Sequence, residues 1–293
     1  MDIRVLKYFL EVVEKGSLAK AADSLLTTAP NISRQISDME AQLGTKLFRK
    51  EGRRLELTED GLFLKERAKE IVSLAERTEN DIKTRSQEIS GNIFIGAAET
   101  PAMRKISSVV AEITREYPAV SFRFRSGDAE LVCDGLDSGI LDFGILAEPV
   151  DIRKYGHIKL PVSDQWGLLM SKDSPLAKLP SVRPEDLIGV PLMCSEQMLA
   201  GNGLAGWMGK DADRLRYVFT FNLITTAAMM AESNIGCVLT FKDLVSTEGK
   251  NLCFRRLNPK LETGLYLVWR EDKRFSKAAQ LFLDEFQTFF QGT

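Results

Sequence analysis

The side chains of this chain that are best placed to do chemistry are polar and basic groups near the N-terminus. Arg34 belongs to a segment whose apolar residues recur every three or four positions (Ile32, Ile36, Met39, Leu43). Arg34 therefore lies off the apolar face of a helix. A guanidinium can donate two hydrogen bonds to a guanine in the major groove, which makes Arg34 the first candidate for reading a base. The alternative is that Arg34 pairs only with a phosphate or with Asp38.

A short basic stretch follows this helix. Between Lys46 and Arg54 there are five Lys and Arg residues and one acidic residue. Two alternating runs surround Glu51 and Gly52, as expected for a β-hairpin. The alternative is a solvated charged loop on an ordinary helical domain. A basic hairpin directly after a short helix pair instead indicates DNA binding, with the hairpin along the backbone.

The predicted DNA contacts come from the start of the helix and from the hairpin. We expect phosphate contacts from the hydroxyl groups and the hairpin arginines, whereas Asn31 could reach either a base or a phosphate. The full set is Thr28, Ala29, Pro30, Asn31, Ser33, Arg34, Arg49, Lys50, Arg53 and Arg54.

Two earlier helices must position these residues. A first apolar stripe recurs at helical spacing (Leu6, Phe9, Leu10, Val13), and Gly16 ends that helix. A short second helix over residues 18–25 is rich in alanine, which allows a third helix to approach closely. Pro30 then lies in the first turn of the third helix, where its missing N–H does no harm, and Gly44 ends that helix. Residues 1–58 thus predict a winged helix-turn-helix.

This N-terminal pattern resembles the signature of the LysR-type transcriptional regulators. The matching residues extend nearly unbroken to residue 61: Phe9-Leu10-Glu11-Val12-Val13, Gly16-Ser17-Leu18, Ala21-Ala22, Leu25, Pro30, Ile32-Ser33-Arg34-Gln35-Ile36, Glu40, Leu43-Gly44, Leu47-Phe48-Arg49 and Leu57-Thr58-Glu59-Asp60-Gly61. The family often has Ser-Gln-Pro where this chain has Thr28-Ala29-Pro30. Ala29 lacks the polar group of that glutamine, although its methyl could contact a thymine methyl.

Residues 59–90 predict a long connecting helix. Its steps of four and three residues form a heptad pattern (Leu64, Ala68, Ile71, Ala75, Thr78, Ile82, Arg85, Ile89). One interpretation is a helix lying on its own domain, and the other is a two-chain coiled coil. The resemblance implies the second, with antiparallel pairing in a homodimer, a homotetramer on adjacent sites of double-stranded DNA, and contact with RNA polymerase. Paired DNA-binding heads predict a partly palindromic site.

Residues 91–293 alternate short apolar strands with helices, which predicts a parallel sheet flanked by helices. Two such halves with crossing segments near 160–163 and 265–269 resemble the effector domain of the same family, which is similar to periplasmic binding proteins. The overall fold class is α/β, with a winged helix-turn-helix, a long linker helix and this two-subdomain effector domain. We define subdomain I as residues 91–162 and 267–293, and subdomain II as residues 163–266.

Small ligands bind such folds between the halves, at the carboxyl ends of strands. The turn from Ala97 to Pro101 lies there, and a helix N-terminus with a hydroxyl suits an anion such as a carboxylate. Glu99 would repel a dianion but tolerate a zwitterion such as an amino acid. The resemblance points to these effector contacts: Ala98, Glu99, Thr100, Pro101, Gly127, Asp128, Ala147, Glu148, Ser195, Glu196, Gln197, Asn222 and Thr225. The alternative for each is a capping role without a ligand.

Composition and net charge limit the classes of protein to which this chain could belong. The 293 residues carry a formal net charge of −2, so the basic residues are a local feature, as in a site-specific DNA binder. The sequence has no run of about eighteen apolar residues and no secretory signal, so we expect a cytoplasmic protein without a membrane span. Four scattered cysteines and one histidine, His157, predict no metal site, no catalytic residue and no cofactor other than the effector.

Two other functions remain as alternatives. A solute-binding protein would use the α/β cleft alone, without a DNA-binding head. An enzyme would use Glu99 or Asp128 as an acid or base in the cleft, but no nucleophile–base pair or glycine fingerprint accompanies them.

Overall fold

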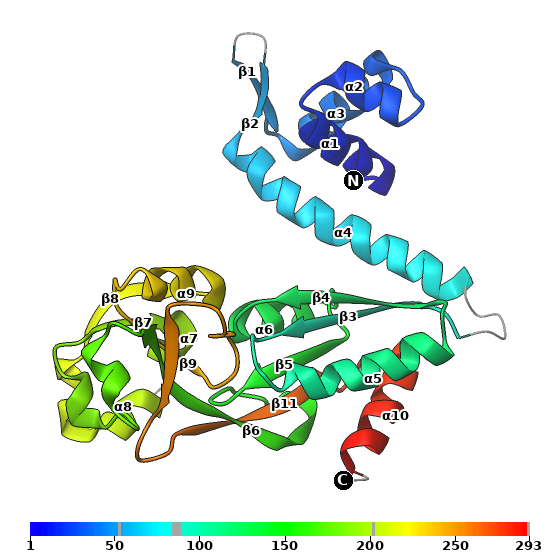
Figure 1. Cartoon of the computed structure of the whole chain (residues 1–293). Coiled ribbons are helices and arrows are strands. Elements are labelled where there is room, and N and C mark those ends of the chain that lie inside the picture. Colours follow the sequence, from blue (N-terminus) through cyan, green and yellow to red (C-terminus); the bar gives the residue numbers. More distant parts are fainter. Residues whose placement is uncertain (52–53, 84–88, 201–202, 292–293) are drawn as a thin grey trace. The chain divides into compact units, whose positions relative to one another are not determined.

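The computed structural model describes residues 1–51, 54–83, 89–200 and 203–291. The chain divides into two compact units, residues 1–86 and residues 87–293. Each unit is labelled by element in Figure 1 and is considered by itself below.

The first unit is a helical bundle with a hairpin and a long helix. Its elements are α1 (Ile3–Lys15), α2 (Leu18–Ser24), α3 (Ala29–Leu43), β1 (Phe48–Glu51), β2 (Arg54–Leu57) and α4 (Glu59–Lys83). Gly16 and Gly44 end α1 and α3 with φ of 65° and 71°, the left-handed conformation that glycine adopts without strain. The predicted three helices and hairpin are therefore present in the predicted order.

The apolar stripe of α4 packs within its own unit. Leu64, Ala68 and Val72 are buried against Leu6 and Phe9 of α1. Lys7 of α1 also forms an ion pair with Glu76 of α4, with 2.7 Å between Nζ and Oε1. The first part of the heptad pattern thus contacts α1 of the same chain, as in the first of the two interpretations. Of its later positions, the side chain of Ile82 and all of Arg85 lie outside the described residues.

The second unit is a mixed α/β domain. Its strands are β3 (Gly91–Ala97), β4 (Val120–Ser126), β5 (Phe143–Ala147), β6 (Tyr155–Ser171), β7 (Pro191–Ser195), β8 (Arg216–Phe221), β9 (Cys237–Phe241), β10 (Leu252–Arg256) and β11 (Glu262–Arg270). Its α-helices are α5 (Met103–Glu116), α6 (Ala129–Asp137), α7 (Glu196–Ala200), α8 (Gly203–Met208), α9 (Ile224–Glu232) and α10 (Lys277–Gln291). Short 3-10 helices cover Pro175–Lys178, Pro184–Leu187 and Gly209–Arg214.

The strands follow the order β4-β3-β5-β11-β6-β9-β7-β8, with β10 beside β6. The pairs among β3, β4 and β5 are parallel, as are the pairs of β7 with β8 and β9. The crossing strands β6 and β11 are antiparallel to each other and to their neighbours. The prediction of a parallel sheet is therefore right for the centre of each subdomain and wrong for the ribbon that joins them.

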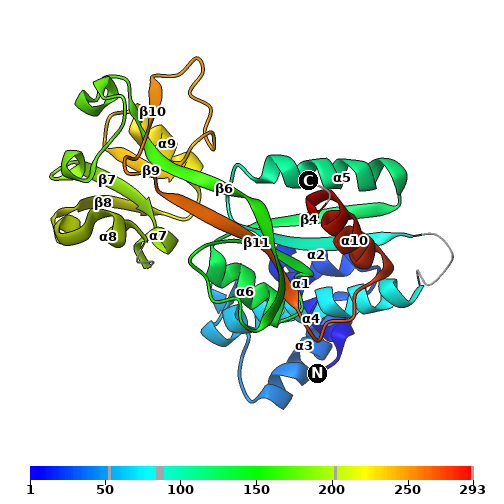
Figure 2. The same cartoon turned by 90° about the horizontal axis from the view of Figure 1, so that it is seen from below.

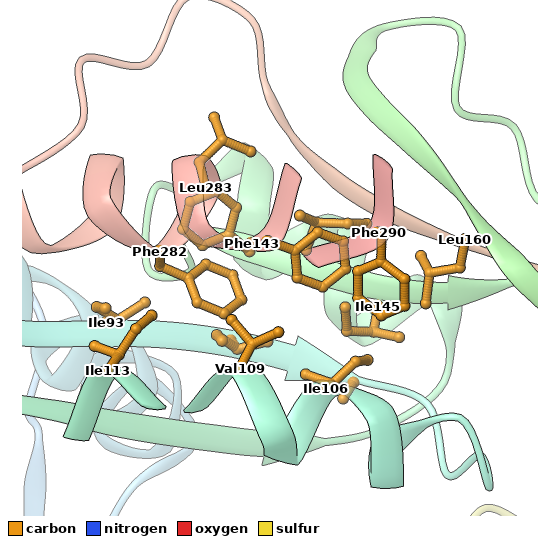
Figure 3. Packing of buried hydrophobic residues seen from close by; sticks show 14 of the residues in the cluster. Ile93, Ile106, Val109, Ile113, Phe143, Ile145, Leu160, Phe282, Leu283 and Phe290 are labelled. Carbon is orange, nitrogen blue, oxygen red and sulfur yellow. The ribbon is translucent and has the colours of Figure 1, made fainter. Parts of the chain in front are cut away.

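The two subdomains are built around separate cores. In subdomain I, α5 and α10 cover one face of the sheet, and their side chains surround Phe143 and Ile145 (Figure 3). Helix α6 covers the other face through Val132 and Leu136. In subdomain II, α9 packs on one face through Ala227, while α7 and α8 lie in the cluster on the other face. Strands β6 and β11 extend from one subdomain into the other (Figure 2).

Strand β6 is longer than the sequence indicates, because Pro161 does not interrupt it. The sequence predicts a crossing segment near residues 160–163, and β6 is a continuous strand through it from Tyr155 to Ser171. The register between β6 and β11 shifts between Gly264 and Tyr266, opposite the segment that contains Pro161. A β-bulge is one of the few places where a strand tolerates a residue without a backbone N–H.

Candidate functional site

The first turns of α3 present a polar surface next to a buried apolar face. Ile32 and Ile36 are buried on the inner side, whereas Asn31, Ser33 and Arg34 are exposed. The hydroxyl of Thr28 caps the helix by accepting a bond from the Asn31 amide at 3.4 Å. This arrangement leaves the predicted DNA-contacting residues of α3 together on one accessible helix end. Ala29 is half-buried and Pro30 is exposed at the same end.

Arg34 is available for a ligand even though it has an intramolecular partner. Its guanidinium lies 3.9 Å from the Asp38 carboxylate, and its side chain is 82% exposed. An exposed pair of this length contributes little to stability, so its loss on binding costs little. The Asn31 amide group is held more firmly, since its Nδ2 donates to the Thr27 hydroxyl at 3.0 Å.

The hairpin formed by β1 and β2 is in register from Phe48 opposite Leu57 to Glu51 opposite Arg54. Arg49 is exposed and pairs across the strands with Glu56, with 3.1 Å between Nη2 and Oε2. The predicted contact Arg53 lies outside the described residues, as do the side chains of Lys50 and Arg54. The structure therefore places only Arg49 of the predicted hairpin contacts.

A buried carboxylate joins α3 to the hairpin. Glu40 accepts hydrogen bonds from the backbone amides of Leu47 and Phe48 at 2.9 and 3.3 Å. It also accepts a bond from the Lys46 ammonium at 2.6 Å. Burial alone would raise the pKa of Glu40, but these hydrogen bonds outweigh it and lower the pKa. Glu40 thereby fixes β1 relative to α3, and the sequence reasoning did not assign it this role.

A pocket lies between the two subdomains of the second unit. It takes in about 750 Å³ of space, part of which is open to solvent. The predicted residues that line it are Ala98, Glu99, Gly127, Asp128, Ala147, Glu148, Ser195, Glu196, Gln197 and Asn222. Further lining residues that the sequence did not indicate are Pro149, Trp166, Met198, Phe221, Ile224, Leu239, Thr240, Phe241 and Leu244. We refer to this pocket as the cleft.

Three predicted effector residues do not line the cleft. Thr100 is buried, and its hydroxyl donates to the carboxylate of Asp164 on β6 and accepts from the Ala102 amide at 3.1 Å. Pro101 is half-buried at the start of α5, and Thr225 lies on the exposed side of α9. The Thr100 hydroxyl is thus engaged by bonds within the chain, while the N-cap residue of α5 is Ala102. Burial raises the pKa of its partner Asp164, while the bond from Thr100 opposes the shift.

Carboxylates in the cleft are held by backbone amides and by neighbouring side chains. Asp128 caps α6 by accepting from the Leu131 amide at 2.9 Å. Glu148 accepts from the Tyr266 hydroxyl at 2.7 Å, the Lys159 ammonium at 3.0 Å and the Gly264 amide at 3.1 Å. These bonds, that from Tyr266 first, lower the pKa of Glu148. The carboxylate is therefore ionised at neutral pH.

Besides the bonds made to the ribbon of β6 and β11, three side-chain hydrogen bonds of the described residues connect the subdomains around the cleft. Glu99 of subdomain I accepts from the Ile224 amide at the start of α9, at 2.7 Å. The Gln197 amide group donates to the Ala147 carbonyl at 3.4 Å. Arg104 of α5 donates to the Asp243 carbonyl at 2.9 Å. The relative position of the subdomains thus depends on a few polar contacts, which a ligand can replace.

Outside these two sites, we searched the described residues for metal ligands, reactive cysteines and membrane-spanning helices. No group of three or more His, Cys, Asp and Glu side chains within them could hold a metal ion. All four cysteines are free, and burial raises the pKa of the Cys194 thiol to about 12, which keeps it protonated. Within the described ranges, no helix has both the length and the apolar character needed to cross a membrane.

Comparisons with known proteins agree with this architecture. Residues 3–62 match the family model of the bacterial regulatory helix-turn-helix proteins of the lysR family, and residues 86–291 match the LysR substrate binding domain. An uncharacterised HTH-type transcriptional regulator of Bacillus subtilis, YvbU, is 26% identical over 97% of this chain and 97% of its own length. A probable RuBisCO transcriptional regulator of Cyanophora paradoxa is 25% identical over 99% of this chain and 91% of its own length.

Solved structures show the same fold. The LysR family regulator CbnR superposes with a TM-score of 0.77 at 19% identity, covering 99% of both chains. CbnR in complex with its target DNA gives 0.76 at 19% identity, covering 99% of this chain and 100% of that one. HinK from Pseudomonas aeruginosa gives 0.56 at 26% identity, covering 97% and 96%.

The helix-turn-helix, the two-subdomain fold and both family matches, which together span nearly the whole chain, lead to one assignment. The chain belongs to the LysR family, whose members are DNA-binding transcriptional regulators with an effector-binding domain and not enzymes.

Proposed function

We propose that this regulator reads its operator with the first turns of α3 and is controlled by a small molecule in the cleft. The observation that carries the DNA half is the exposed polar end of α3, with Arg34 held only by a loose pair to Asp38. Arg34 reads a base edge, while Thr28, Ser33 and Arg49 contact phosphates. Ala29, Pro30 and Asn31 complete this surface, and Lys50, Arg53 and Arg54 extend it along the hairpin.

The control half rests on the few polar bonds that connect the subdomains. A ligand that binds one arrangement of the subdomains better than another shifts the population toward it. The bonds from Ile224 to Glu99 and from Gln197 to Ala147 border the cleft, so they change when it fills. No further cofactor is needed for this mechanism.

The working form is a homodimer through α4, assembled further into a homotetramer, that acts in the cytoplasm on double-stranded DNA and on RNA polymerase. Exposed apolar side chains on α4 support the dimer. Phe63, Leu62 and Leu74 are exposed in the isolated chain although the buried stripe of α4 is already covered by α1. Such side chains indicate a surface that a second chain covers.

Selection of bound fragments from the source genome by the purified full-length protein tests the DNA half. We expect enrichment of a partly palindromic site at physiological salt. The Arg34→Ala variant should enrich this site more weakly and lose the preference at one base pair, while a matched variant of an exposed cation on α2, Lys20→Ala, should select the unchanged site. Equal recovery of random and genomic fragments by the unmodified protein would contradict the proposal.

A further inference from the structure

We propose that the effector is an organic cation, an ammonium group on an apolar body, that binds in the cleft. This inference rests on the proposed function of the cleft as the effector site. The sequence predicts a ligand carboxylate at a helix N-terminus, or an amino acid. The ligand proposed here has the ammonium group of an amino acid but no carboxylate.

The first argument is the charge of the lining. Four carboxylates line the cleft, those of Glu99, Asp128, Glu148 and Glu196. Among the lining residues that the structure describes there is no Lys or Arg to balance them. Lys159 neutralises one, since it pairs with Glu148 from outside the lining. A ligand carboxylate would enter a field of like charge without a cationic partner, whereas an ammonium would be attracted.

The second argument is that several backbone amides at helix starts around the cleft already have acceptors within the chain itself. Helix N-termini bind anions through free backbone amides. Here Glu99 accepts from the first amide of α9, and Asp128 accepts from an amide in the first turn of α6. The Ser195 hydroxyl accepts from the Met198 amide in α7. A carboxylate that approached these amides would compete with groups of the chain itself.

The third argument is the apolar side of the cleft. Trp166 and Phe241 both line it, with their ring centroids 4.3 Å apart. Leu239 and Leu244 extend this apolar wall. Aromatic faces attract ammonium groups as well as apolar bodies, and the attraction grows when water is excluded. The wall and the carboxylates together fit a molecule with one charged end and one apolar end.

The four carboxylates differ in how many of their hydrogen-bonding positions are still available to a ligand. Glu148 has three donors and Glu99 holds α9, so both are largely satisfied. Asp128 caps α6 through Oδ1, and Glu196 is exposed and accepts a long bond of 3.5 Å from the Thr220 hydroxyl. Asp128 and Glu196 face the cleft from opposite subdomains. We therefore assign them as the ammonium-binding pair.

The test is calorimetric titration of the full-length protein with matched probes. Phenethylamine and 3-phenylpropionate share a body and differ in charge, as do putrescine and adipate in a second pair. We expect the better amine to bind at least about tenfold tighter than its matched acid. L-phenylalanine should bind no tighter than phenethylamine, because its carboxylate would be repelled by the carboxylates of the lining.

Variants connect the binding to the assigned residues. Asp128→Asn removes the charge but keeps a good N-cap for α6, and Glu196→Gln removes the charge at constant size. Each should weaken amine binding at least about fivefold, in line with loss of one charged partner. Glu112→Gln, on the exposed side of α5, is the control and should leave binding unchanged.

The outcomes separate this inference from the proposed function. The cation inference would be overturned if the acids bound more tightly than the amines or if neither amine bound. It would also be overturned if both variants bound the amines as tightly as the unmodified protein. DNA selection without any ligand is measured in parallel and reports on the regulator alone. An intact DNA selection with acid-selective binding in the cleft would thus overturn only the ligand class.

Discussion

The Glu99 carboxylate at the end of β3 accepts a hydrogen bond of 2.7 Å from the Ile224 amide, the first residue of α9. The two residues belong to different subdomains and both line the cleft. A carboxylate at a helix N-terminus stabilises the helix dipole as well as the bond. Glu99 therefore joins the subdomains at the point where the effector is proposed to bind.

Replacing Glu99 by alanine should loosen the first turn of α9. We expect a loss of about 1–2 kcal/mol in the stability of the effector domain, since one hydrogen bond to a charged group and one favourable dipole contact disappear. Hydrogen exchange should rise in peptides that cover residues 222–232. Glu112→Ala on α5 serves as the control, and unchanged exchange at α9 would show that the bond does not hold the helix.

Substitution of Arg34 and of Arg49 should have different effects on DNA binding. Arg34→Ala should cost about 1–3 kcal/mol on the operator and relax specificity at one base pair, because a base contact is lost. Arg49→Ala should weaken operator and random DNA alike and reduce the salt slope by about 1, as expected for one phosphate. Binding isotherms at several salt concentrations distinguish the two. An identical loss on both DNAs for Arg34→Ala would contradict a base contact.

Glu40 should make the stability of the first unit depend on acid pH. Its folded pKa is lowered from 4.5, so its stabilisation is present above the unfolded pKa. That stabilisation declines as pH falls below about 4.5 and is lost once pH has passed through the lower folded pKa. Glu40→Gln should cost about 2 kcal/mol at pH 7, the scale of a buried hydrogen bond to a charge. Unfolding curves between pH 3 and 7 test this.

In those curves the difference between the unmodified protein and the Glu40→Gln variant should shrink toward pH 3. Glu66→Gln removes an exposed carboxylate of the same unit and should change neither the stability nor its pH dependence. A difference that stays constant with pH would mean that the charge of Glu40 is not what joins the hairpin to α3.

The contribution of Asp164 to stability should depend on pH in the opposite direction from that of Glu40. Burial raises its folded pKa, so the neutral form is favoured by folding and the stabilisation is lost as pH rises through that pKa. Asp164→Asn, which is always neutral, should raise the melting temperature of the effector domain by a few degrees at pH 7. The gain should diminish toward pH 4. A loss of stability at pH 7 would indicate that the Thr100 hydroxyl needs a charged partner.

The exposed face of α4 should control the oligomeric state. Phe63, Arg67, Glu70 and Leu74 share one face by their spacing, and the Phe63 side chain is among the most exposed apolar groups. If the proposed dimer forms through this face, the double variant Phe63→Glu, Leu74→Glu should be a monomer in sedimentation equilibrium while the helical content stays unchanged. A dimer that survives the double variant would require another interface.

The sequence predicted those parts of the molecule in which local pattern decides the structure. Spacing of apolar residues, Gly16 and Gly44 defined α1 and α3, and alternating strands and helices defined the centres of both subdomains. The full length of β6 could not be predicted, because whether a strand continues through Pro161 depends on its partner strand, where a register shift removes the need for a backbone N–H. Strand β10 was missed because a short mixed segment at a sheet edge has no strong periodicity.

The cleft was harder to predict than the fold. Residues at strand ends were found because topology gathers them, but Trp166 and Phe241 sit within apolar runs that look like ordinary core. Whether such an aromatic ring is part of a core or lines a cavity depends on how two segments that are distant in sequence pack together. The hydrogen bonds of Thr100 and Glu99 also depend on partners at Asp164 and Ile224, which are far away in sequence.

The ribbon of β6 and β11 contains one irregular point, and Glu148 is bonded to it from the cleft. The register shift falls between Gly264 and Tyr266, whose backbone amide and hydroxyl group respectively donate to Glu148. Elsewhere the two strands pair in continuous register, so we expect bending between the subdomains to concentrate at this bulge. A molecule that contacted Glu148 would then act at the expected hinge, and the size of its effect need not follow its affinity.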